Sequence, residues 1–307
     1  MYGNTALLKL EVAKKPGTVF EEELKTLYGG VETFVLFIGC ARSGHSLVGA
    51  ILDAHPNIMI PHEFRVLSKW NYYKNNSKGD SEMLKNRLFF DLHALSREQA
   101  MFGNRASNCL HGYSYHVPGQ WQGKFKEKLK VIGDKKGTGT SHLLFKSENF
   151  HVLEEIQRTL KIPLKFIHVI RNPFDNIATK VLRQLHTRDS ARGGSFKVND
   201  SILLDSVITS HFKLIESAQK LHHHEDFEVI DIYSHEIITN PQENLRKLCS
   251  FLGVASDEEY IDAASKLLYT QPSKTRHSVV WTTEQRARVT NEMKQYKFMK
   301  PFTFESL

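Results

Sequence analysis

Three short apolar runs along the chain predict β-strands. They occupy residues 33–39, 165–170 and 227–232, and each is too short to form a helix. A continuous apolar run of this length is typical of a strand that is covered on both faces, as in a parallel sheet. We therefore expect these segments to be strands of one parallel sheet.

Helical patterns lie between and after these runs. Apolar residues recur at helical spacing behind the Asn-Pro pair at 172–173, an N-cap followed by a proline suited to the first helical position. A longer amphipathic pattern covers 204–218, and another Asn-Pro pair at 240–241 predicts a capped helix that ends at Gly253. Strands that alternate with helices predict a three-layer α/β/α fold with a central parallel sheet. Ligands of such folds bind beyond the carboxyl ends of the strands.

Composition adds an expected partner and a domain count. The 307 residues carry 41 Lys and Arg against 34 Asp and Glu, and the formal charge of +7 indicates an anionic partner. The chain has no internal repeat and no Pro/Gly/Ser-rich linker. We expect a single domain at 31–307 behind a loosely attached N-terminal arm at 1–30.

The expected compartment follows from the cysteines and the hydropathy. Cys40, Cys109 and Cys249 are scattered, without metal-ligand spacing, which favours a reducing environment. No apolar run is long enough to span a membrane, and the N-terminus carries charges where a signal peptide would be apolar. We expect a cytoplasmic protein without a membrane span, or a protein of the Golgi lumen if an anchor has been removed.

The loop after the first strand, residues 39–46, predicts an anion site. Small residues between a strand and a helix start direct backbone N–H groups and the positive end of the helix at one point. The spacing fits the phosphate loop of nucleoside triphosphatases except that His45 stands in place of the lysine, while Arg42 lies inside the turn. An imidazole is a poor substitute for that lysine, so a different phosphate ester is expected. The alternative is a βα turn without a ligand.

This loop, followed by Leu-Asp-Ala-His-Pro-Asn-Ile at 52–58, resembles the 5′-phosphosulfate loop of sulfotransferases. These enzymes use 3′-phosphoadenosine 5′-phosphosulfate (PAPS) as the sulfuryl donor. The run on to residue 66 is most similar to the tyrosylprotein and Golgi-type branch. Segments 171–179, 233–253 and 273–281 resemble the 3′-phosphate motif, a Tyr-Glu-Asp-Leu…Phe-Leu-Gly segment and the late basic loop of the superfamily. The resemblance therefore implies the P-loop-like sulfotransferase fold.

The resemblance also implies which residues bind PAPS. The arginine and the hydroxyls of the first loop would hold the 5′-phosphate and stabilise charge on the leaving oxygen, and an arginine with a hydroxyl residue eight positions later would hold the 3′-phosphate. No metal is expected. The cofactor-binding candidates are Arg42, Ser43, Gly44, His45, Ser46, Leu47, Arg171, Thr179, Tyr233, Lys274 and Arg276.

The candidate catalytic residues are Arg42, Lys135, Glu63 and His62. Lys135 ends a Gly-Asp-Lys segment that resembles a strand end whose lysine reaches the sulfuryl group. Glu63 is the first choice for the base, because a glutamate follows the same motif in the resembling branch and a closed cationic site can tune its pKa toward neutral pH. His62 is the rival base, and the alternative for Glu63 is an ion pair with Arg65 or a loop cation.

The sequence does not identify the acceptor. Residues 64–130 gather many aromatic residues, which suits an acceptor-binding insertion, although core packing explains them equally well. We expect PAPS or its product PAP and a hydroxyl-bearing small molecule as partners, no nucleic acid, and a homodimer as an open alternative. The competing functions are a P-loop nucleotide kinase and a non-catalytic nucleotide-binding module. Three consecutive histidines at 222–224 do not share a helix face, so a solvated helix end is favoured there over a metal site.

Overall fold

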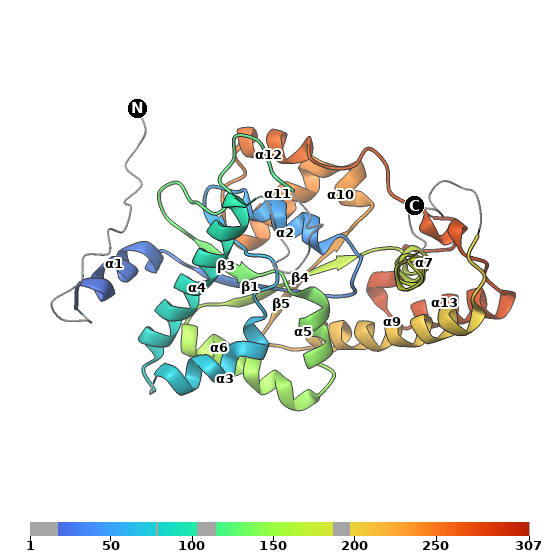
Figure 1. Ribbon diagram of the computed structural model, residues 1–307, viewed down its shortest axis with the longest axis horizontal. Coiled ribbons are helices and arrows are strands. Elements are labelled where there is room, and N and C mark those ends of the chain that lie inside the picture. The colour runs from blue at the N-terminus through green and yellow to red at the C-terminus, as the bar shows by residue number, and fades with distance from the viewer. Residues whose placement is uncertain (1–17, 78, 103–114, 187–196, 307) are drawn as a thin grey trace.

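A five-stranded parallel sheet forms the centre of the computed structural model, which describes residues 18–77, 79–102, 115–186 and 197–306 (Figure 1). The strand order is β2-β3-β1-β4-β5, and every neighbouring pair is parallel. The strands are β1 (Thr33–Ile38), β2 (Ile58–Met59), β3 (Val131–Asp134), β4 (Leu164–Ile170) and β5 (Glu228–Tyr233). The predicted strands are confirmed, and the two-residue β2 at the edge is an addition too short to leave an apolar run.

Both faces of the sheet are buried. Alternate side chains of β1 enter two different apolar clusters: Phe34 and Leu36 belong to one, and Val35 and Phe37 to the other. Successive strand residues point to opposite faces, so an unbroken apolar run requires a helical layer on each side. This is why the run at the start of the domain could not alternate with polar residues.

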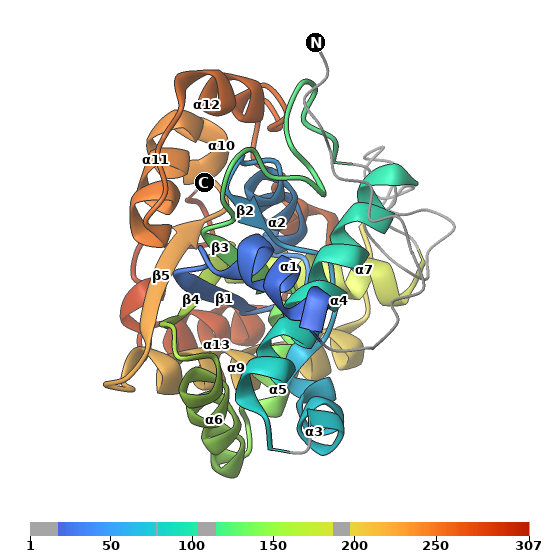
Figure 2. The ribbon, with the colours of Figure 1, turned by 90° about the vertical axis from the view of Figure 1, so that its left-hand side faces the viewer.

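One helical layer consists of short helices and lies above the sheet in Figures 1 and 2. It consists of α2 (His45–Asp53), α10 (Glu236–Thr239), α11 (Pro241–Leu252) and α12 (Glu258–Ser265). Gly253 ends α11 in the left-handed conformation, at φ 75°, as the sequence predicted. The cap expected from the Asn-Pro pair at 240–241 is absent, because Asn240 ends α10 and its side chain accepts no hydrogen bond from α11.

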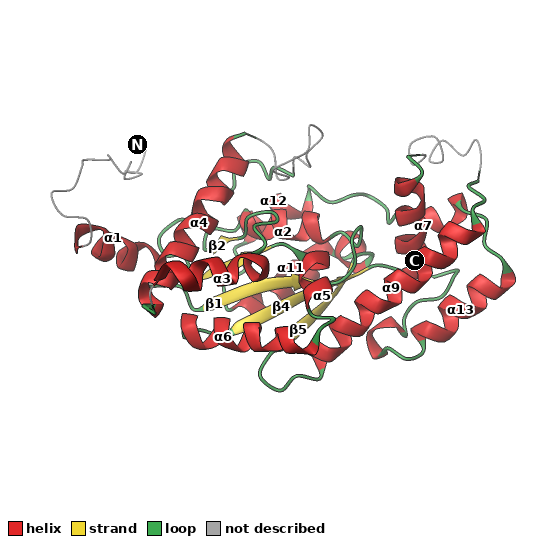
Figure 3. Cartoon of the chain, turned by 60° about the horizontal axis from the view of Figure 1, so that its bottom comes forward, coloured by secondary structure: helices red, strands yellow, loops and turns green. Residues whose placement is uncertain are grey.

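The opposite layer is larger, and Figure 3 brings it forward, with α9 running beside α13. The remaining helices are α1 (Thr18–Tyr28), α3 (Val66–Ser77), α4 (Ser81–Met101), α5 (Gly137–Leu143), α6 (Phe150–Leu160), α7 (Pro173–Gln184), α9 (Ser201–His222) and α13 (Thr283–Met293). Short 3-10 turns lie at Ser147–Asn149, Thr275–Ser278 and Lys297–Met299. The predicted three-layer α/β/α class is therefore confirmed.

Part of the expected N-terminal arm packs on the domain. Tyr28, at the end of α1, is buried, stacks edge-on against Phe89 and places its hydroxyl 3.0 Å from His93 Nδ1 of α4. Residues 1–17 of that arm, and residues 103–114 of the expected insertion with Cys109, lie outside the described residues. Within the described part, no helix combines the length and the apolar character that crossing a bilayer requires.

Candidate active site

The predicted site residues meet at the carboxyl end of the sheet. The segment 39–46 follows β1, His62 and Glu63 follow β2, Lys135 follows β3 and Arg171 follows β4. Because all five strands are parallel, these segments lie along the same edge. Residues separated by more than a hundred positions are thereby brought into one site.

The loop between β1 and α2 has the backbone of an anion cradle. Gly39, Arg42 and Gly44 have positive φ angles of 111°, 71° and 104°, and Gly44 precedes α2 without any side-chain cap on the helix. The first N–H groups of an uncapped helix lack internal acceptors and favour negative charge. Ser141 of α5 fixes the start of the loop by accepting a hydrogen bond from the Gly39 N–H at 2.8 Å.

Buried polar atoms around this loop lack partners in the described structure. They are Ser43 Oγ, both ring nitrogens of His45 and Thr138 Oγ1. An unsatisfied buried polar group costs about 1–3 kcal/mol, so a cluster of them indicates an absent ligand. Burial, followed by the charge of Lys135, lowers the pKa of His45 well below its usual value. His45 is thus neutral and offers one N–H rather than a charge.

Lys135 is the centre of a charged cluster. Its Nζ atom lies 3.2 Å from Glu63 Oε1, 3.1 Å from Ser46 Oγ and 3.3 Å from His62 Nε2, and the side chain is 1% exposed. Lys136 Nζ contacts the other carboxylate oxygen of Glu63 at 2.5 Å. Lys136, which is not among the predicted site residues, therefore belongs to the site.

Lys135 and Glu63 both have a lowered pKa, for different reasons. Burial lowers the pKa of Lys135 to about 8, although Glu63 opposes this shift. Burial by itself would raise the pKa of Glu63, but the charge of Lys135 and the hydrogen bond and charge of Lys136 outweigh it and lower the pKa to about 2. The expected tuning of Glu63 toward neutral pH is absent, because two ammonium groups stabilise its carboxylate.

A buried carboxylate holds the segment that carries Glu63. Asp134 accepts hydrogen bonds from the backbone N–H groups of Phe64, Arg65 and Val66 at 2.7–3.0 Å. Glu63 and Arg65 have φ angles of 63° and 70°, a conformation that non-glycine residues adopt only under constraint. Asp134, the aspartate of the Gly-Asp-Lys segment, therefore holds this strained turn in place through three backbone hydrogen bonds.

The motif at 52–58 also proves structural in its contacts. Asp53 accepts hydrogen bonds from the Ile60 N–H at 2.6 Å and from the Ser96 hydroxyl at 2.8 Å. Both hydrogen bonds are buried. His55 Nδ1 accepts from the Asn57 N–H at 3.0 Å. These residues shape the path from α2 through β2 to His62, and Gln99 of α4 continues it by pairing with both backbone groups of His62.

Arg171 joins three segments at the other end of the site. Its guanidinium donates to Thr179 Oγ1 at 2.9 Å, to the Arg42 carbonyl at 3.3 Å and to Thr275 Oγ1 at 3.1 Å. Thr179 and Thr275 are 2.8 Å apart. The predicted pair of Arg171 and Thr179 is brought together, and Thr275, which was not singled out, completes it. Asn176, one turn before Thr179 on α7, is buried with both amide atoms unpartnered in the described structure.

Arg276 has a different place from the one expected. Its side chain is 0% exposed and donates to both carboxylate oxygens of Asp175, at 2.9 and 2.7 Å, and to the carbonyls of Thr303 and Phe304. Its donors are therefore committed to the protein and not directed at a nucleotide. Lys274, two residues earlier, is exposed.

Two further candidates also differ from expectation. Leu47 packs in the apolar cluster above the sheet, and its N–H donates to the Gly44 carbonyl at 2.9 Å, so it serves the helix start. The hydroxyl of Tyr233, at the end of β5, donates to the Phe298 carbonyl at 3.0 Å, and burial raises the pKa of Tyr233 to about 12. The hydrogen-bonding group described in each residue is therefore engaged within the protein.

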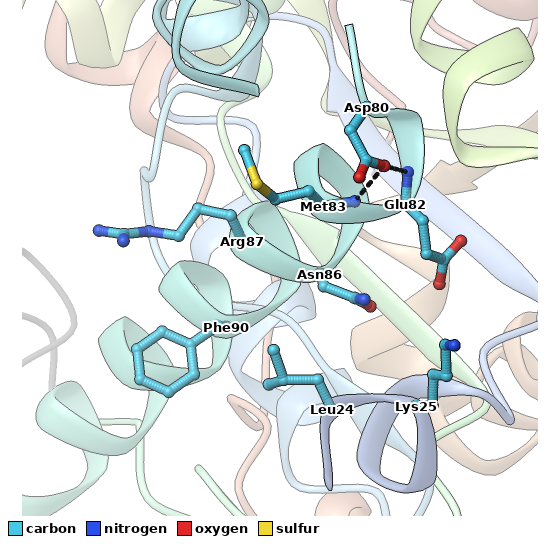
Figure 4. A pocket seen from close by; sticks show the side chains of 8 residues that line it. All are labelled: Leu24, Lys25, Asp80, Glu82, Met83, Asn86, Arg87 and Phe90. Atoms are coloured by element: carbon cyan, nitrogen blue, oxygen red, sulfur yellow. Dashed lines mark hydrogen bonds between the residues drawn. The ribbon is translucent and has the colours of Figure 1, made fainter. Parts of the chain in front are cut away.

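A surface groove lies elsewhere. It has a volume of about 390 Å³ and lies between α1 and α4, where Figure 4 shows Asp80 capping α4 through the N–H groups of Glu82 and Met83. None of its lining residues is a predicted site residue. In the expected insertion, Trp70, Tyr73 and Phe89 are buried core residues, whereas Tyr72 and Phe102 are exposed.

Comparisons with known proteins indicate the family of this chain. The model of the sulfotransferase family matches residues 35–258. Solved structures to which this chain is similar include the sulfotransferase domain of a Synechococcus olefin synthase, at 13% identity and a TM-score of 0.48, covering 87% of this chain and 94% of that one. A mouse sulfotransferase complexed with PAP matches at 11% identity and a TM-score of 0.45, covering 90% and 88%. No curated protein sequence matches.

Proposed function

This chain belongs to the sulfotransferase family, and we propose that it transfers the sulfuryl group of PAPS to a hydroxyl or amine acceptor. The observation that carries the proposal is the buried Lys135 cluster beside a phosphate loop whose buried polar atoms lack partners. PAPS supplies an anionic sulfuryl group next to its 5′-phosphate, and a separate 3′-phosphate. A site with two cationic ends, at Lys135 and at Arg171, fits that charge distribution.

The residues of the first loop would hold the 5′ end. The N–H groups at the start of α2, the Ser43 hydroxyl and the neutral His45 ring are donors at a helix N-terminus, where an anion is favoured. Arg42 adds a permanent charge in the same turn. These donors are fixed before the ligand arrives, so they stabilise charge on the leaving oxygen without reorganising.

Lys135 would neutralise charge on the transferring group. Its Nζ atom lies between Ser46 and Glu63, which places a single ammonium between the helix start and the candidate base. Arg171 with Thr179 and Thr275 would bind the 3′-phosphate, because its guanidinium is already oriented by their hydroxyls. That the first loop is most similar to the tyrosylprotein and Golgi-type branch remains part of this proposal.

Glu63 would accept the proton of the acceptor hydroxyl. Its pKa of about 2 reflects the pairing with two lysines, and a carboxylate held in that way is a weak base. We infer that the anionic sulfuryl group draws Lys135 toward itself, which weakens the pairing and makes Glu63 more basic when the donor is bound. His62 Nε2, 3.3 Å from the Lys135 ammonium, remains the second candidate. The acceptor is inferred to be a small molecule that enters beside the segment 64–130.

A thermal-shift comparison tests the donor class. PAP should raise the melting temperature, because a ligand that binds only the folded state stabilises it. Adenosine 5′-monophosphate, which lacks the 3′-phosphate, should give a smaller rise, and Arg171→Met should remove the difference between the two ligands. Stabilisation by ATP with Mg²⁺ and none by PAP would favour the kinase function and refute the proposal. A screen of hydroxyl acceptors with labelled PAPS then measures transfer directly.

A further inference from the structure

Two histidines and an aspartate that the reaction does not use meet beneath the sheet. His168 Nδ1 of β4 lies 3.0 Å from Asp231 Oδ1 of β5, and His222 Nε2, on the last residue of α9, lies 3.0 Å from the same oxygen. All three potential ligand atoms lie within 4.8 Å of one another. His168 is buried, while His222 and Asp231 are 22% and 24% exposed, so solvent reaches the cluster from one side.

The fold explains why residues so far apart in sequence converge. His168 and Asp231 are register partners in neighbouring parallel strands, so both side chains leave the same face of the sheet. The long helix α9 runs under that face and ends beside β5, which brings His222 to them. The ring of Phe298 packs on both imidazoles, with centroid distances of 5.0 and 5.2 Å, and holds the two rings against each other on one side of the cluster.

Hydrogen bonds account for only part of this arrangement. His168 Nδ1 is aligned with the carboxylate as a hydrogen-bond donor should be. His222 Nε2 is equally close to the same oxygen, as an ion-pair contact that does not meet the geometry of a hydrogen bond. Such a contact compensates only in part for burying the nitrogen, and an unsatisfied buried polar group costs about 1–3 kcal/mol. A group placed between the three ligand atoms would satisfy it.

We propose that His168, His222 and Asp231 bind a divalent transition-metal ion of the Zn²⁺ class, with solvent in the remaining position. Two imidazoles and a carboxylate are the ligands that such ions prefer, whereas Mg²⁺ and Ca²⁺ favour oxygen. Bonds of tetrahedral Zn²⁺ place neighbouring donor atoms roughly 3.3 Å apart. The two separations between a histidine nitrogen and Asp231 Oδ1, both 3.0 Å, are close to this value, and the two histidine nitrogens lie within 4.8 Å of each other. On binding, the proton on each facing nitrogen moves to the other ring nitrogen or to solvent.

The site would stiffen the floor of the phosphate loop. A methyl group added to Gly39 would lie 2.9 Å from His168 Cδ2, so the imidazole packs directly against the first residue of that loop. A metal ion that fixes His168 would therefore stabilise the packing beneath the loop. Its role is structural, since none of its ligands is among the residues that surround Lys135.

Metal content of the full-length, tag-free protein tests the proposal. After treatment with a chelator, the protein is dialysed against Zn²⁺ and the bound metal is measured by mass spectrometry. We expect one equivalent and a higher melting temperature with Zn²⁺. Co²⁺ should give the visible absorption of a four-coordinate site. Zinc at background level in the wild-type protein overturns the proposal whatever the variants do.

Neighbouring histidines provide a matched pair of variants. His222→Asn should weaken Zn²⁺ binding by roughly tenfold or more, whereas His223→Asn, which changes the exposed adjacent residue, should leave it unchanged. Asp231→Asn gives a second test from another element, and circular dichroism verifies that each variant is folded. Equal zinc affinity in His222→Asn and the wild type, or an equal loss in His222→Asn and His223→Asn, contradicts the assignment.

Discussion

The two ends of the site differ in how fully their polar groups are satisfied. At the nucleotide end, Arg171 and Arg276 are hydrogen-bonded to hydroxyls, carbonyls and a carboxylate. At the reactive end, Ser43 and His45 have buried polar atoms without partners in the described structure. The proposed nucleotide end consists of Arg171, Asp175, Thr179, Thr275 and Arg276, and the proposed reactive end consists of Ser43, His45, Glu63, Lys135 and Lys136. Asn176 is the exception beside the nucleotide end, because its buried amide atoms lack partners in the described structure.

The difference distinguishes polar groups that are satisfied within the protein from polar groups that the proposed ligand would satisfy. Satisfied groups stabilise the fold whether or not a ligand is bound, whereas unmet groups are stabilised only when a ligand arrives. Substitution of Arg276 or Asp175 should therefore act chiefly on folding, and substitutions at the reactive end chiefly on turnover, whereas Arg171 is proposed to serve both the fold and the 3′-phosphate.

Arg276→Ala is expected to have the largest effect on stability. It leaves the Asp175 carboxylate, 5% exposed, without its ion-pair partner and should lower the free energy of unfolding by about 3–5 kcal/mol. Urea unfolding measures the change. Lys274→Ala, at an exposed position two residues away, is the control and should stay within about 0.5 kcal/mol. A stable Arg276→Ala protein that has lost only PAP affinity would show that this arginine binds the nucleotide after all.

Glu63→Gln should affect turnover and spare binding. Removing a general base lowers kcat by about 10²–10⁴-fold, while the affinity for PAP should remain, because Glu63 contacts the lysines and not the phosphate loop. Transfer from labelled PAPS and PAP titration supply the two readings. His62→Gln serves as the parallel variant. Full activity in Glu63→Gln would leave Glu63 as a structural partner of Lys135 and Lys136.

Gly49→Ala should displace Lys135. A Cβ atom at this position on α2 would lie 2.5 Å from Lys135 Cγ, so the lysine stem must move, at a cost of about 1–3 kcal/mol. We expect lower stability together with lower kcat. In a Lys135→Ala background the same substitution should cost less, because the clashing Cγ is gone. Additive losses of stability in the double variant would show that the two residues do not compete for space.

The pH dependence of activity should report Lys135. Its pKa of about 8 in the folded protein predicts that kcat/KM falls above this pH as the ammonium loses its proton, when an aliphatic alcohol that does not titrate there is the acceptor. Lys135→Arg should shift that limb to higher pH. A limb that persists at the same pH in the variant belongs to another group.

Stability should respond to Lys135 in the opposite sense. Between about pH 8 and the ordinary lysine pKa of 10.5, the unfolded chain keeps the proton and the folded one has released it. Stability relative to Lys135→Met should therefore rise with pH over this interval. Unfolding measured at pH 8 and pH 10 is sufficient to detect it. A flat difference between the two proteins would mean that Lys135 stays charged when buried.

The fold was largely predictable because its signals are local. Apolar runs of strand length and Asn-Pro starts depend on neighbouring residues, and β1, β4, β5 and α7 lie where they were expected. β2 contains two residues and leaves no pattern to read. The site was predictable to the level of its segments, since glycine-rich turns and strand ends also reside in the local sequence.

The contacts within the site were harder to predict. Arg171 and Arg276 both resemble phosphate ligands in a motif, yet only the three-dimensional packing shows that Arg276 is bonded to Asp175. The same holds for His222, whose partners lie in two strands elsewhere in the chain. A side chain's partner is a long-range property, and sequence spacing does not encode it.

The sequence by itself determined the parallel sheet, the glycine-containing loop that we propose as the anion site, and the set of charged residues at the strand ends. Hydrophobic periodicity and backbone chemistry act over a few residues and suffice for these features. The tertiary structure decided which charges pair, which polar atoms are left unmet and which way each pKa moves. These depend on burial and on distances of a few ångströms between segments that meet only when the chain has folded.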